Sequence, residues 1–191
     1  LARTIFVDDP DIGQWAYTYD ANGNMATQID GRGQIIGFDY DALNRLIAKD
    51  YGDDQAHGYG EVRYYYDSRI NNVGRGRRTG MIDESGFTAW IYNQPGQLVE
   101  EIKFIDEEMF TTQYSYDSLN RLDTLTYPDG EVVTYTYDEA DRVNSLTADE
   151  GATVYLQDAA YNAFDQPTSL VMGAGGLETS FSYYESGEDA T

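Results

Sequence analysis

Large apolar side chains stand at every second position in short segments along the whole chain. An alternation of this kind places the side chains on one face of a β-strand. The residues between them are often Thr, Ser or Asp, which can face water on the other side. The pattern predicts one strand for each of the following sets of alternating apolar residues: Trp15, Tyr17 and Tyr19; Phe38 and Tyr40; Val62, Tyr64 and Tyr66; Trp90 and Tyr92; Tyr114 and Tyr116; Val133, Tyr135 and Tyr137; and Phe181 and Tyr183.

A turn signal follows the last tyrosine of each segment. We call these residues the anchor tyrosines: Tyr19, Tyr40, Tyr66, Tyr92, Tyr116, Tyr137 and Tyr161. Each is followed by an Asp or Asn that can accept backbone N–H groups and begin a type I turn: Asp20, Asp41, Asp67, Asn93, Asp117, Asp138 and Asn162. Three residues later, six turns carry a residue type that tolerates a left-handed backbone: Gly23, Asn44, Gly96, Asn120, Asp141 and Asp165. This combination predicts a hairpin loop with a β-bulge.

The hairpins also need turns at their far ends. Asp-Gly and related pairs between strands are strong turn signals. The candidates are Asp30-Gly31, Asp50-Tyr51-Gly52, Ser85-Gly86, Asp129-Gly130 and Glu150-Gly151. Because one hairpin buries too little apolar surface to offset its chain entropy, we expect neighbouring hairpins to stack.

The predicted fold is therefore all-β, an array of stacked antiparallel β-hairpins. Open twisted sheets of about 15 strands usually curl, so we expect a curled, spiralling sheet. Residues 1–13 are expected to form the returning strand of a partial repeat, residues 14–187 one continuous array of about seven to eight hairpins, and residues 188–191 a tail. Because the chain starts at Leu1 and a last copy opens at Tyr183 without closing, we expect a longer parent array.

The repeated segment resembles the YD repeat, also called the Rhs repeat, whose pattern is roughly aromatic-x-Tyr-Asp-x-x-Gly-Arg-Leu. The similar copies include residues 17–25, 38–46 and 114–122. The resemblance implies a spiralling β-sheet in large secreted or surface proteins, which in Rhs toxins wraps into a hollow cocoon around a toxic domain. It also implies a core segment of the type Asp-Pro-x-Gly-Leu near an autoproteolytic site. Residues 94–98 lack the acid of that motif and are interpreted as a repeat turn, so no cleavage centre is expected.

Composition narrows the classes of partner. The formal net charge is −22, which disfavours nucleic acid and anionic membranes because phosphates require Lys and Arg. The chain has no cysteine, which excludes disulfides and cysteine-based metal sites. No apolar run is long enough for a transmembrane helix, and no signal peptide is visible. The 18 tyrosines favour strands with one half-buried face.

Candidate catalytic groups are few. His57 lies in a Gly-rich segment without a partner nucleophile, which is typical of an exposed loop residue. The exposed-aromatic candidates Trp15, Trp90 and Tyr65 could stack on sugars, although Trp15 and Trp90 share the face of their anchor tyrosines and core packing is the default for both. Asp and Glu are so abundant that a pair of carboxylates could be chosen at many places in the sequence. They therefore indicate no particular glycosidase site.

A calcium site also lacks support. The segment that begins at Asp20 starts like a calcium loop, but Met25 and Gly31 stand where an EF-hand requires Gly and Glu. Looser calcium binding by residues 8–11 or by Asp53 and Asp54 stays open beside the alternative of a solvated charge run.

The third turn departs from the pattern. Residues 68–78 make this turn longer than the others, and they include Arg69, Arg75, Arg77 and Arg78. A loop insertion explains this at small entropic cost. The alternative is a basic knob that contacts an acidic neighbour, such as another copy of the protein.

The function predicted from the sequence is a non-catalytic structural scaffold, part of a secreted shell or a self-assembling extracellular filament. The alternative is a surface adhesin or carbohydrate-binding module, and an enzyme is the third class. No catalytic, cofactor or metal residues are assigned. Expected partners are other copies of the chain or the rest of a longer YD-repeat polypeptide, with glycans as the alternative, and the expected location is extracellular or at the cell surface.

Overall fold

The computed structural model describes residues 3–52, 61–68 and 73–183. These residues form sixteen β-strands and a short 3-10 turn at Asp149–Gly151. Within the described residues, no helix is long and apolar enough to cross a membrane. The strands are β1 (Phe6–Asp9), β2 (Gly13–Tyr19), β3 (Met25–Ile29), β4 (Ile35–Tyr40), β5 (Leu46–Asp50), β6 (Glu61–Tyr66), β7 (Arg78–Asp83), β8 (Gly86–Tyr92), β9 (Leu98–Ile105), β10 (Glu108–Tyr116), β11 (Leu122–Thr126), β12 (Val132–Tyr137), β13 (Val143–Ala148), β14 (Thr153–Tyr161), β15 (Pro167–Met172) and β16 (Leu177–Ser180).

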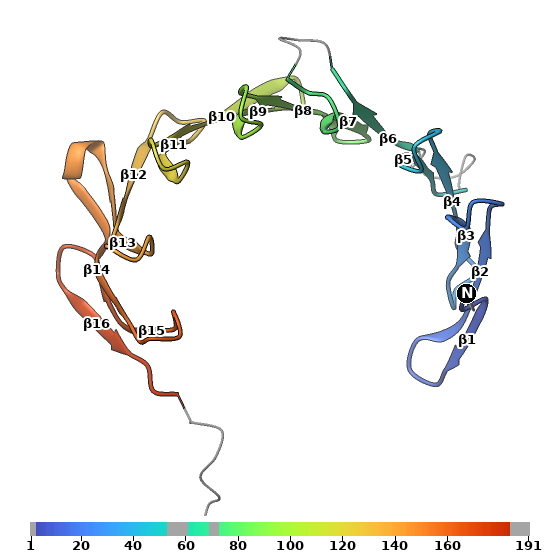
Figure 1. Cartoon of the computed structure of the whole chain (residues 1–191). Coiled ribbons are helices and arrows are strands. Elements are labelled where there is room, and N and C mark those ends of the chain that lie inside the picture. Colours follow the sequence, from blue (N-terminus) through green and yellow to red (C-terminus); the bar gives the residue numbers. More distant parts are fainter. Residues whose placement is uncertain (1–2, 53–60, 69–72, 184–191) are drawn as a thin grey trace, which may run out of the picture. The chain divides into compact units, whose positions relative to one another are not determined.

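The strands follow one another as antiparallel neighbours in sequence order (Figure 1). The chain divides into two compact units, Leu1–Phe110 and Thr111–Thr191, with the boundary inside β10. Antiparallel pairing runs from β1 to β9 in the first unit and from β10 to β16 in the second. The predicted all-β array of stacked antiparallel hairpins is therefore confirmed.

Each anchor tyrosine marks a β-bulge. In the first hairpin, Tyr19 lies opposite Met25 while Thr18 lies opposite Thr27, so one residue of the returning strand is extra. The same register shift occurs at Tyr40, Tyr66, Tyr92, Tyr116, Tyr137 and Tyr161. A bulge arises here because a type I turn alone does not match the twist of the strands, and a left-handed residue with a bulge restores the match.

The anchor tyrosines lie on one face of the sheet, which we call the tyrosine face. In the second unit this face places Tyr114 beside Leu125, which lies beside Val133, and Val133 beside Ala148. The opposite face carries hydroxyl pairs across three hairpins: Thr18 with Thr27 at 2.6 Å, Ser115 with Thr124 at 2.7 Å, and Thr136 with Ser145 at 2.7 Å. The predicted alternation of apolar and polar faces holds in these hairpins.

Each unit has little interior. Val133 and Ala148 are among the few buried apolar residues, and no large side chain among the described residues is fully buried. Many large apolar side chains are exposed instead, including Phe87 at 42% and Phe104 at 37%. A single layer of strands explains this, because apolar residues on a sheet face need a second layer before they can be fully buried.

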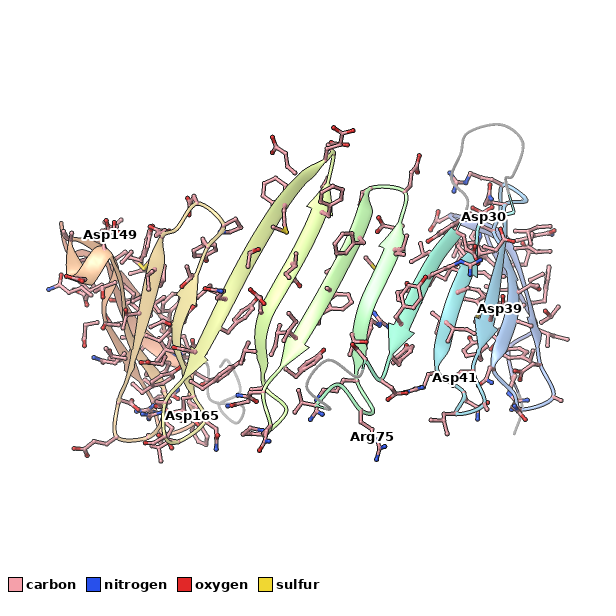
Figure 2. The ribbon with its side chains drawn as sticks, turned by 90° about the horizontal axis from the view of Figure 1, so that it is seen from above. Asp30, Asp39, Asp41, Arg75, Asp149 and Asp165 are labelled. Carbon is pink, nitrogen blue, oxygen red and sulfur yellow. The ribbon has the colours of Figure 1, made fainter. Side chains whose placement is uncertain are left out.

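The two ends of the hairpins differ. We call the turns after the anchor tyrosines the anchor edge and the turns at the other ends the far edge. In the first unit, Figure 2 places Asp41 and Arg75 at one end of the strands and Asp30 at the other. Two far-edge turns, at Tyr127–Glu131 and at Glu150-Gly151, use Gly130 and Gly151 in left-handed conformations with φ of 94° and 92°.

The far-edge turn predicted at Asp30-Gly31 is present, but its left-handed residue lies two positions later. The turn after β3 runs from Asp30 to Gln34, and Gly33 is its left-handed residue with φ of 82°. Gly31 has a different use: a Cβ atom there would lie 2.4 Å from the carbonyl oxygen of Ile12, so only glycine allows the backbone of the β1–β2 turn to approach.

Among the far-edge turns that the sequence analysis did not name are those after β9 and after β15. Asp106 and Glu107 join β9 to β10 with φ of 50° and 68°. Gly173 and Gly176 turn the chain between β15 and β16 with φ of 64° and 66°. The first was missed because neither residue is Gly or Asn, the types that most easily adopt a left-handed backbone.

Candidate functional site: the clamps at the anchor edge

The anchor edge is built from one local hydrogen-bond pattern. In the second hairpin, the Asp41 N–H donates to the Arg45 carbonyl oxygen at 3.0 Å, and the Asn44 N–H donates to the Asp41 carbonyl oxygen at 2.9 Å. The Asp41 Oδ1 atom accepts the N–H groups of Leu43 and Arg45 at 2.9 and 3.0 Å. Asp41, the first residue of the turn, therefore accepts the backbone N–H groups of the turn, as expected for an Asp at this position.

The structure places all six left-handed candidates in that conformation. Their φ values are 89° for Gly23, 59° for Asn44, 93° for Gly96, 66° for Asn120, 63° for Asp141 and 60° for Asp165. In the stretched third turn, Gly76 takes the equivalent place with φ of 77°. The Gly76 N–H also donates to Asp67 Oδ1 at 2.6 Å, so the longer loop closes on the same carboxylate.

An arginine at the fifth position of the turn pairs with the Asp at the first. The Nε atom of Arg45 donates to Asp41 Oδ2 at 2.7 Å. Arg121 donates in the same way to Asp117 at 2.7 Å, and Arg142 to Asp138 at 2.8 Å. These ion pairs are partly shielded, with side-chain exposures between 22% and 26%.

The same arginines reach the next hairpin. The Arg45 guanidinium donates to Asp67 Oδ2 at 2.7 Å, Arg121 to Asp141 Oδ1 at 2.5 Å, and Arg142 to Asp165 Oδ1 at 3.2 Å. Because each arginine holds a carboxylate of its own turn and one of the following turn, it couples two repeats that are about 20 residues apart in sequence. We call each such arginine with its two carboxylates a clamp.

Each clamp also covers the ring of the next anchor tyrosine. The guanidinium carbon of Arg45 lies 4.4 Å from the centre of the Tyr66 ring. The corresponding distances are 4.4 Å from Arg121 to Tyr137 and 4.7 Å from Arg142 to Tyr161. A guanidinium over an aromatic face gains cation–π attraction and also shields the ring from water.

Several tyrosine hydroxyls tie a hairpin to the one before it. The Tyr66 hydroxyl donates to the carbonyl oxygen of Leu46 at 2.9 Å, and the Tyr137 hydroxyl donates to that of Leu122 at 2.7 Å. Each acceptor is the first residue of the preceding hairpin's returning strand. The same contact joins Tyr92 to Arg78, Tyr161 to Val143 and Tyr183 to Pro167.

The electrostatic setting follows from these contacts. The backbone and side-chain hydrogen bonds from Arg45 hold the pKa of Asp41 below its usual value, and those from Arg142 do the same for Asp138. The pKa of Arg45 is raised by Asp67 and Asp41. Burial raises the pKa of the anchor tyrosines Tyr40, Tyr92, Tyr116 and Tyr137. The carboxylates therefore stay ionised and the phenols stay neutral over a wide pH range.

Three turns replace the arginine with an amide. In two of them the first residue is Asn rather than Asp, and the Asn side chain donates to a Gln: Asn93 to Gln97 at 2.7 Å and Asn162 to Gln166 at 2.8 Å. In the first hairpin, the Asn24 amide donates to Asp20 at 2.9 Å and to Asn44 at 2.8 Å. In each of these three turns, the side chains at the first and fifth positions thus form a hydrogen bond with each other.

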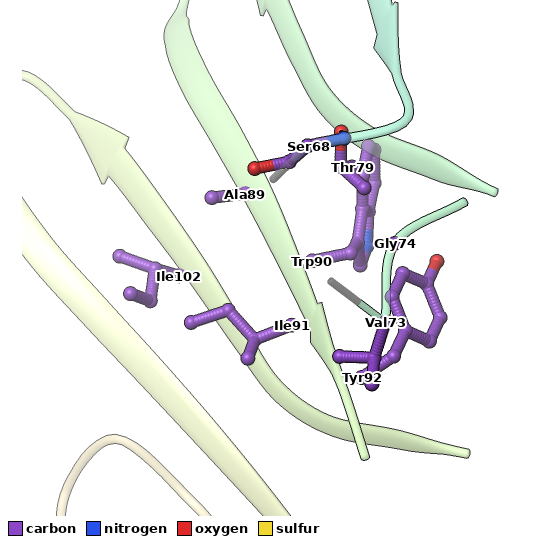
Figure 3. Close-up of a pocket in the computed structure, with 9 residues that line it drawn as sticks. All are labelled: Ser68, Val73, Gly74, Thr79, Ala89, Trp90, Ile91, Tyr92 and Ile102. Atoms are coloured by element: carbon purple, nitrogen blue, oxygen red, sulfur yellow. The ribbon is translucent and has the colours of Figure 1, made fainter. Parts of the chain in front are cut away.

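The stretched third turn flanks a small apolar hollow. Figure 3 shows the hollow, about 150 Å³ in volume and lined by residues that include Val73, Trp90 and Tyr92. Arg77 lies 5.5 Å from the Tyr92 ring centre, and Arg78 lies 4.3 Å from that of Tyr64, so both contact their own sheet. Of the other two arginines of the hypothesised basic knob, Arg75 is exposed and Arg69 lies outside the described residues.

The other sequence candidates are placed as follows. His57, Asp53 and Asp54 lie outside the described residues. Asp9 Oδ1 accepts the N–H groups of Asp11 and Ile12 at 2.8 and 3.2 Å, which is a turn contact. Across residues 3–52, 61–68 and 73–183, no group of three or more His, Cys, Asp or Glu side chains is placed to hold a metal ion.

The aromatic candidates divide between the two faces. The Trp90 indole N–H donates to Glu101 at 2.7 Å and that of Trp15 to the carbonyl oxygen of Ile12 at 3.1 Å, both on the tyrosine face. Tyr65 lies on the opposite face, opposite Gly80, and is 46% exposed.

The sequence analysis missed the clamps. It identified the arginine as a polar residue after the turn and did not connect it to the next repeat. The available signal was the pair within a turn: three turns that begin with Asp have Arg at the fifth position, at 41 and 45, 117 and 121, and 138 and 142, and the two that begin with Asn have Gln there. The first turn is the exception, because Asp20 is followed by Asn24.

Comparison with known proteins agrees with this architecture. The family model described as RHS Repeat matches residues 19–56 and 124–153. No curated protein matches the sequence. Among solved structures, one titled "Crystal Structure of TcdB2-TccC3" superposes with a TM-score of 0.73 at 18% identity, covering 94% of this chain and 10% of that chain.

A second solved structure is titled "Structure of Photorhabdus luminescens Tc holotoxin pore, Mutation TccC3-D651A". It matches with a TM-score of 0.73 at 18% identity, and again 94% of this chain corresponds to 10% of that chain. The chain thus spans about a tenth of the length of these solved chains. At this identity the likeness establishes the fold.

Proposed function

We propose that this chain is a wall segment, a non-catalytic scaffold within a longer RHS-repeat sheet. The matches of the RHS Repeat model to residues 19–56 and 124–153 support this. The observation that carries the proposal is the clamp, which joins each hairpin to the next through Arg45, Arg121 and Arg142. The charged groups of a clamp are paired with one another within the protein. It therefore serves continuity of the sheet rather than recognition of a ligand.

The burial pattern supports the same proposal. A single-layer sheet with few buried side chains gains stability mainly from neighbouring strands. The Tyr183 hydroxyl donates to the Pro167 carbonyl oxygen at 2.8 Å, which repeats the contact made by the earlier anchor tyrosines. We propose that further repeats of the parent polypeptide, or other copies of the chain, continue the sheet in this way.

The setting of the wall is also a proposal. The similar structures carry titles of Tc toxin components, TcdB2-TccC3 and a Tc holotoxin pore. We propose that this chain belongs to a toxin-associated shell that acts outside the cell that makes it. The single-layer sheet is suited to enclose a volume, because a wall one strand layer thick encloses the most space for a given chain length.

Edge extension can be tested at β16, the last strand that the structure describes. The Phe181 N–H donates to Thr168 at 3.0 Å, so the N–H groups of Glu178 and Ser180 alternate away from β15. If the sheet extends by strand addition, Ser180→Pro should abolish self-association, because it removes an outward N–H. Ser180→Ala keeps that N–H and is the matched control.

The measurement is light scattering after size-exclusion chromatography, with electron microscopy of the larger species. The proposal expects arcs, tubes or shells from the wild-type chain and from Ser180→Ala, and monomers from Ser180→Pro. A monodisperse monomer at high concentration that captures specific sugars on a glycan array would contradict the wall and favour the adhesin.

A further inference from the structure

The first unit carries an apolar patch on the face opposite the tyrosines. Ile82, Phe87 and Phe104 lie side by side on β7, β8 and β9, since Ile82 pairs with Phe87 and Phe87 pairs with Phe104. The two phenylalanine rings stack with centroids 5.6 Å apart. Their exposures are 46% for Ile82, 42% for Phe87 and 37% for Phe104, so the row faces outward.

A second row beside the first is recessed. Gly80 lies opposite Ala89, and Ala89 lies opposite Ile102, so the middle strands carry the two smallest side chains of the patch. Tyr65 closes one end, where a Cβ atom added to Gly80 would lie 3.6 Å from its ring. The result is a shallow trough bordered by the Ile82, Phe87 and Phe104 row.

Acidic residues border the patch at the far edge. Glu84 lies in the β7–β8 turn, and Asp106 and Glu107 form the β9–β10 turn. Within the described parts of the chain, none of these three carboxylates forms an ion pair. Arg63 at the end of the row is neutralised by Glu61 at 2.7 Å.

We propose that this surface docks a cationic, amphipathic polypeptide segment of a partner protein. Alternate apolar side chains of the segment would cover the phenylalanine row and the trough, and its Lys or Arg side chains would meet the three acids. Exposed aromatic residues ringed by charge are the usual composition of a protein-binding patch. The inference does not depend on the wall proposal, because it concerns one face of β6 to β9.

The charge excludes the simplest alternative occupant. A second copy of the chain carries the same net charge of −22 and would bring acid against acid at this edge. An anionic membrane would be repelled for the same reason. A cationic polypeptide satisfies both the apolar row and the unpaired carboxylates.

The test uses a synthetic peptide of about a dozen residues in which Leu and Lys alternate, a length that spans a patch of three or four strands. Two control peptides replace Leu by Ser or Lys by Glu. Binding to the wild-type chain is measured by isothermal titration calorimetry. The proposal expects only the Leu-Lys peptide to bind with high affinity.

Two variants locate the site. Phe87→Thr with Phe104→Thr keeps high strand propensity and should weaken binding about tenfold or more, as expected for loss of central aromatic anchors. Met172→Thr with Leu177→Thr is the matched control, since these residues are an exposed, paired apolar set on β15 and β16. That control should bind like the wild type.

A charge series separates docking from general attraction to an acidic protein. Glu84→Gln with Asp106→Asn and Glu107→Asn should weaken binding several-fold, and Asn suits the left-handed backbone at positions 106 and 107. The matched set is Asp129→Asn with Asp149→Asn and Glu150→Asn, which removes three far-edge charges of the second unit. Equal loss in both sets, or unchanged binding in the phenylalanine variant, overturns the proposal. Self-association that the phenylalanine variant abolishes would assign the patch to a second copy instead.

Discussion

Two successive turns of the second unit have one backbone shape and different connections. In the turn from Asp138 to Arg142, the first N–H donates to the fifth carbonyl oxygen at 2.9 Å. In the turn from Asn162 to Gln166, the same bond measures 3.0 Å. Both turns have a left-handed Asp at the fourth position, Asp141 and Asp165. The loop shape is therefore independent of the charges at positions one and five.

The connections to neighbouring hairpins distinguish these turns. Arg142 leaves its own turn and reaches Asp165, the Asn162 carbonyl oxygen at 3.2 Å and the Tyr161 ring. Gln166 accepts a hydrogen bond from Asn162 inside its own turn. Among the described residues, the side chain of Arg142 therefore contacts the following turn, whereas the side-chain hydrogen bond of Gln166 stays within its own turn. The following experiments test that difference.

The largest effect is expected at the anchor tyrosine that receives the clamp. Tyr161→Ala should lower the free energy of unfolding by about 2–3 kcal/mol, because it removes ring contact and the hydroxyl bond to Val143. Phe164→Ala in the adjacent turn is the control. Phe164 is 80% exposed, so its loss should change stability by less than about 0.5 kcal/mol. Urea denaturation measures both, and equal effects would argue against the anchor role.

The clamp itself should have the next largest effect. Arg142→Gln replaces the arginine of the Asp138 turn by glutamine, the residue at the equivalent position of the Asn162 turn. It removes the contacts to Asp138, Asp165 and the Tyr161 ring. We expect the Tm to fall by about 2–4 °C, the shift usual for one lost interaction in a chain of this size. Differential scanning calorimetry provides the measurement.

Gln166→Ala is the matched change in the turn that has no arginine, and its Tm should stay within about 1 °C of the wild type. The loss in Arg142→Gln should also shrink in about 1 M salt, because salt screens partly exposed ion pairs. If the two variants melt alike, the coupling attributed to the fifth residue does not exist.

Removal of one hydroxyl should have a smaller effect. Tyr161→Phe loses only the 2.7 Å bond to the Val143 carbonyl oxygen and should cost about 1 kcal/mol. Tyr127 is 41% exposed, and within the described residues its hydroxyl has no hydrogen-bond partner, so Tyr127→Phe should be neutral. Urea midpoints of the two variants make the comparison, and a neutral Tyr161→Phe would contradict the tie between hairpins.

The sequence predicts the features that one hairpin determines by itself. Tyr137, Asp138 and Asp141 could be assigned because strand alternation, turn donors and left-handed tolerance act over a few residues. The contact between Arg142 and Asp165 could not be assigned, because it depends on the register between two hairpins. Asp106 and Glu107 form a turn without a typical turn residue, and Gly31 is needed for backbone approach across hairpins, so local propensity was insufficient in both places.

The finest test of the comparison is acid titration. Side-chain and backbone hydrogen bonds from Arg142 lower the pKa of Asp138 below 3.8. A lowered pKa in the folded state contributes stability that is present above pH 3.8 and lost as the pH falls through the folded value. Asp138→Asn should therefore be less stable than the wild type near neutral pH, and the difference should vanish on acidification.

The reverse change separates the carboxylate from its partner. Asn162→Asp places a titratable group in the turn whose fifth residue is Gln166, which supplies no charge to hold it ionised. Its stability should depend on pH less steeply than the Asp138 contribution does, when urea midpoints are measured between about pH 2 and 6. A slope as steep as that of the Asp138 turn would mean that the carboxylate needs no arginine in its own turn, because the backbone N–H groups and Arg142 of the preceding turn are sufficient. The arginine would then act through its contacts with the next hairpin and not through its own turn.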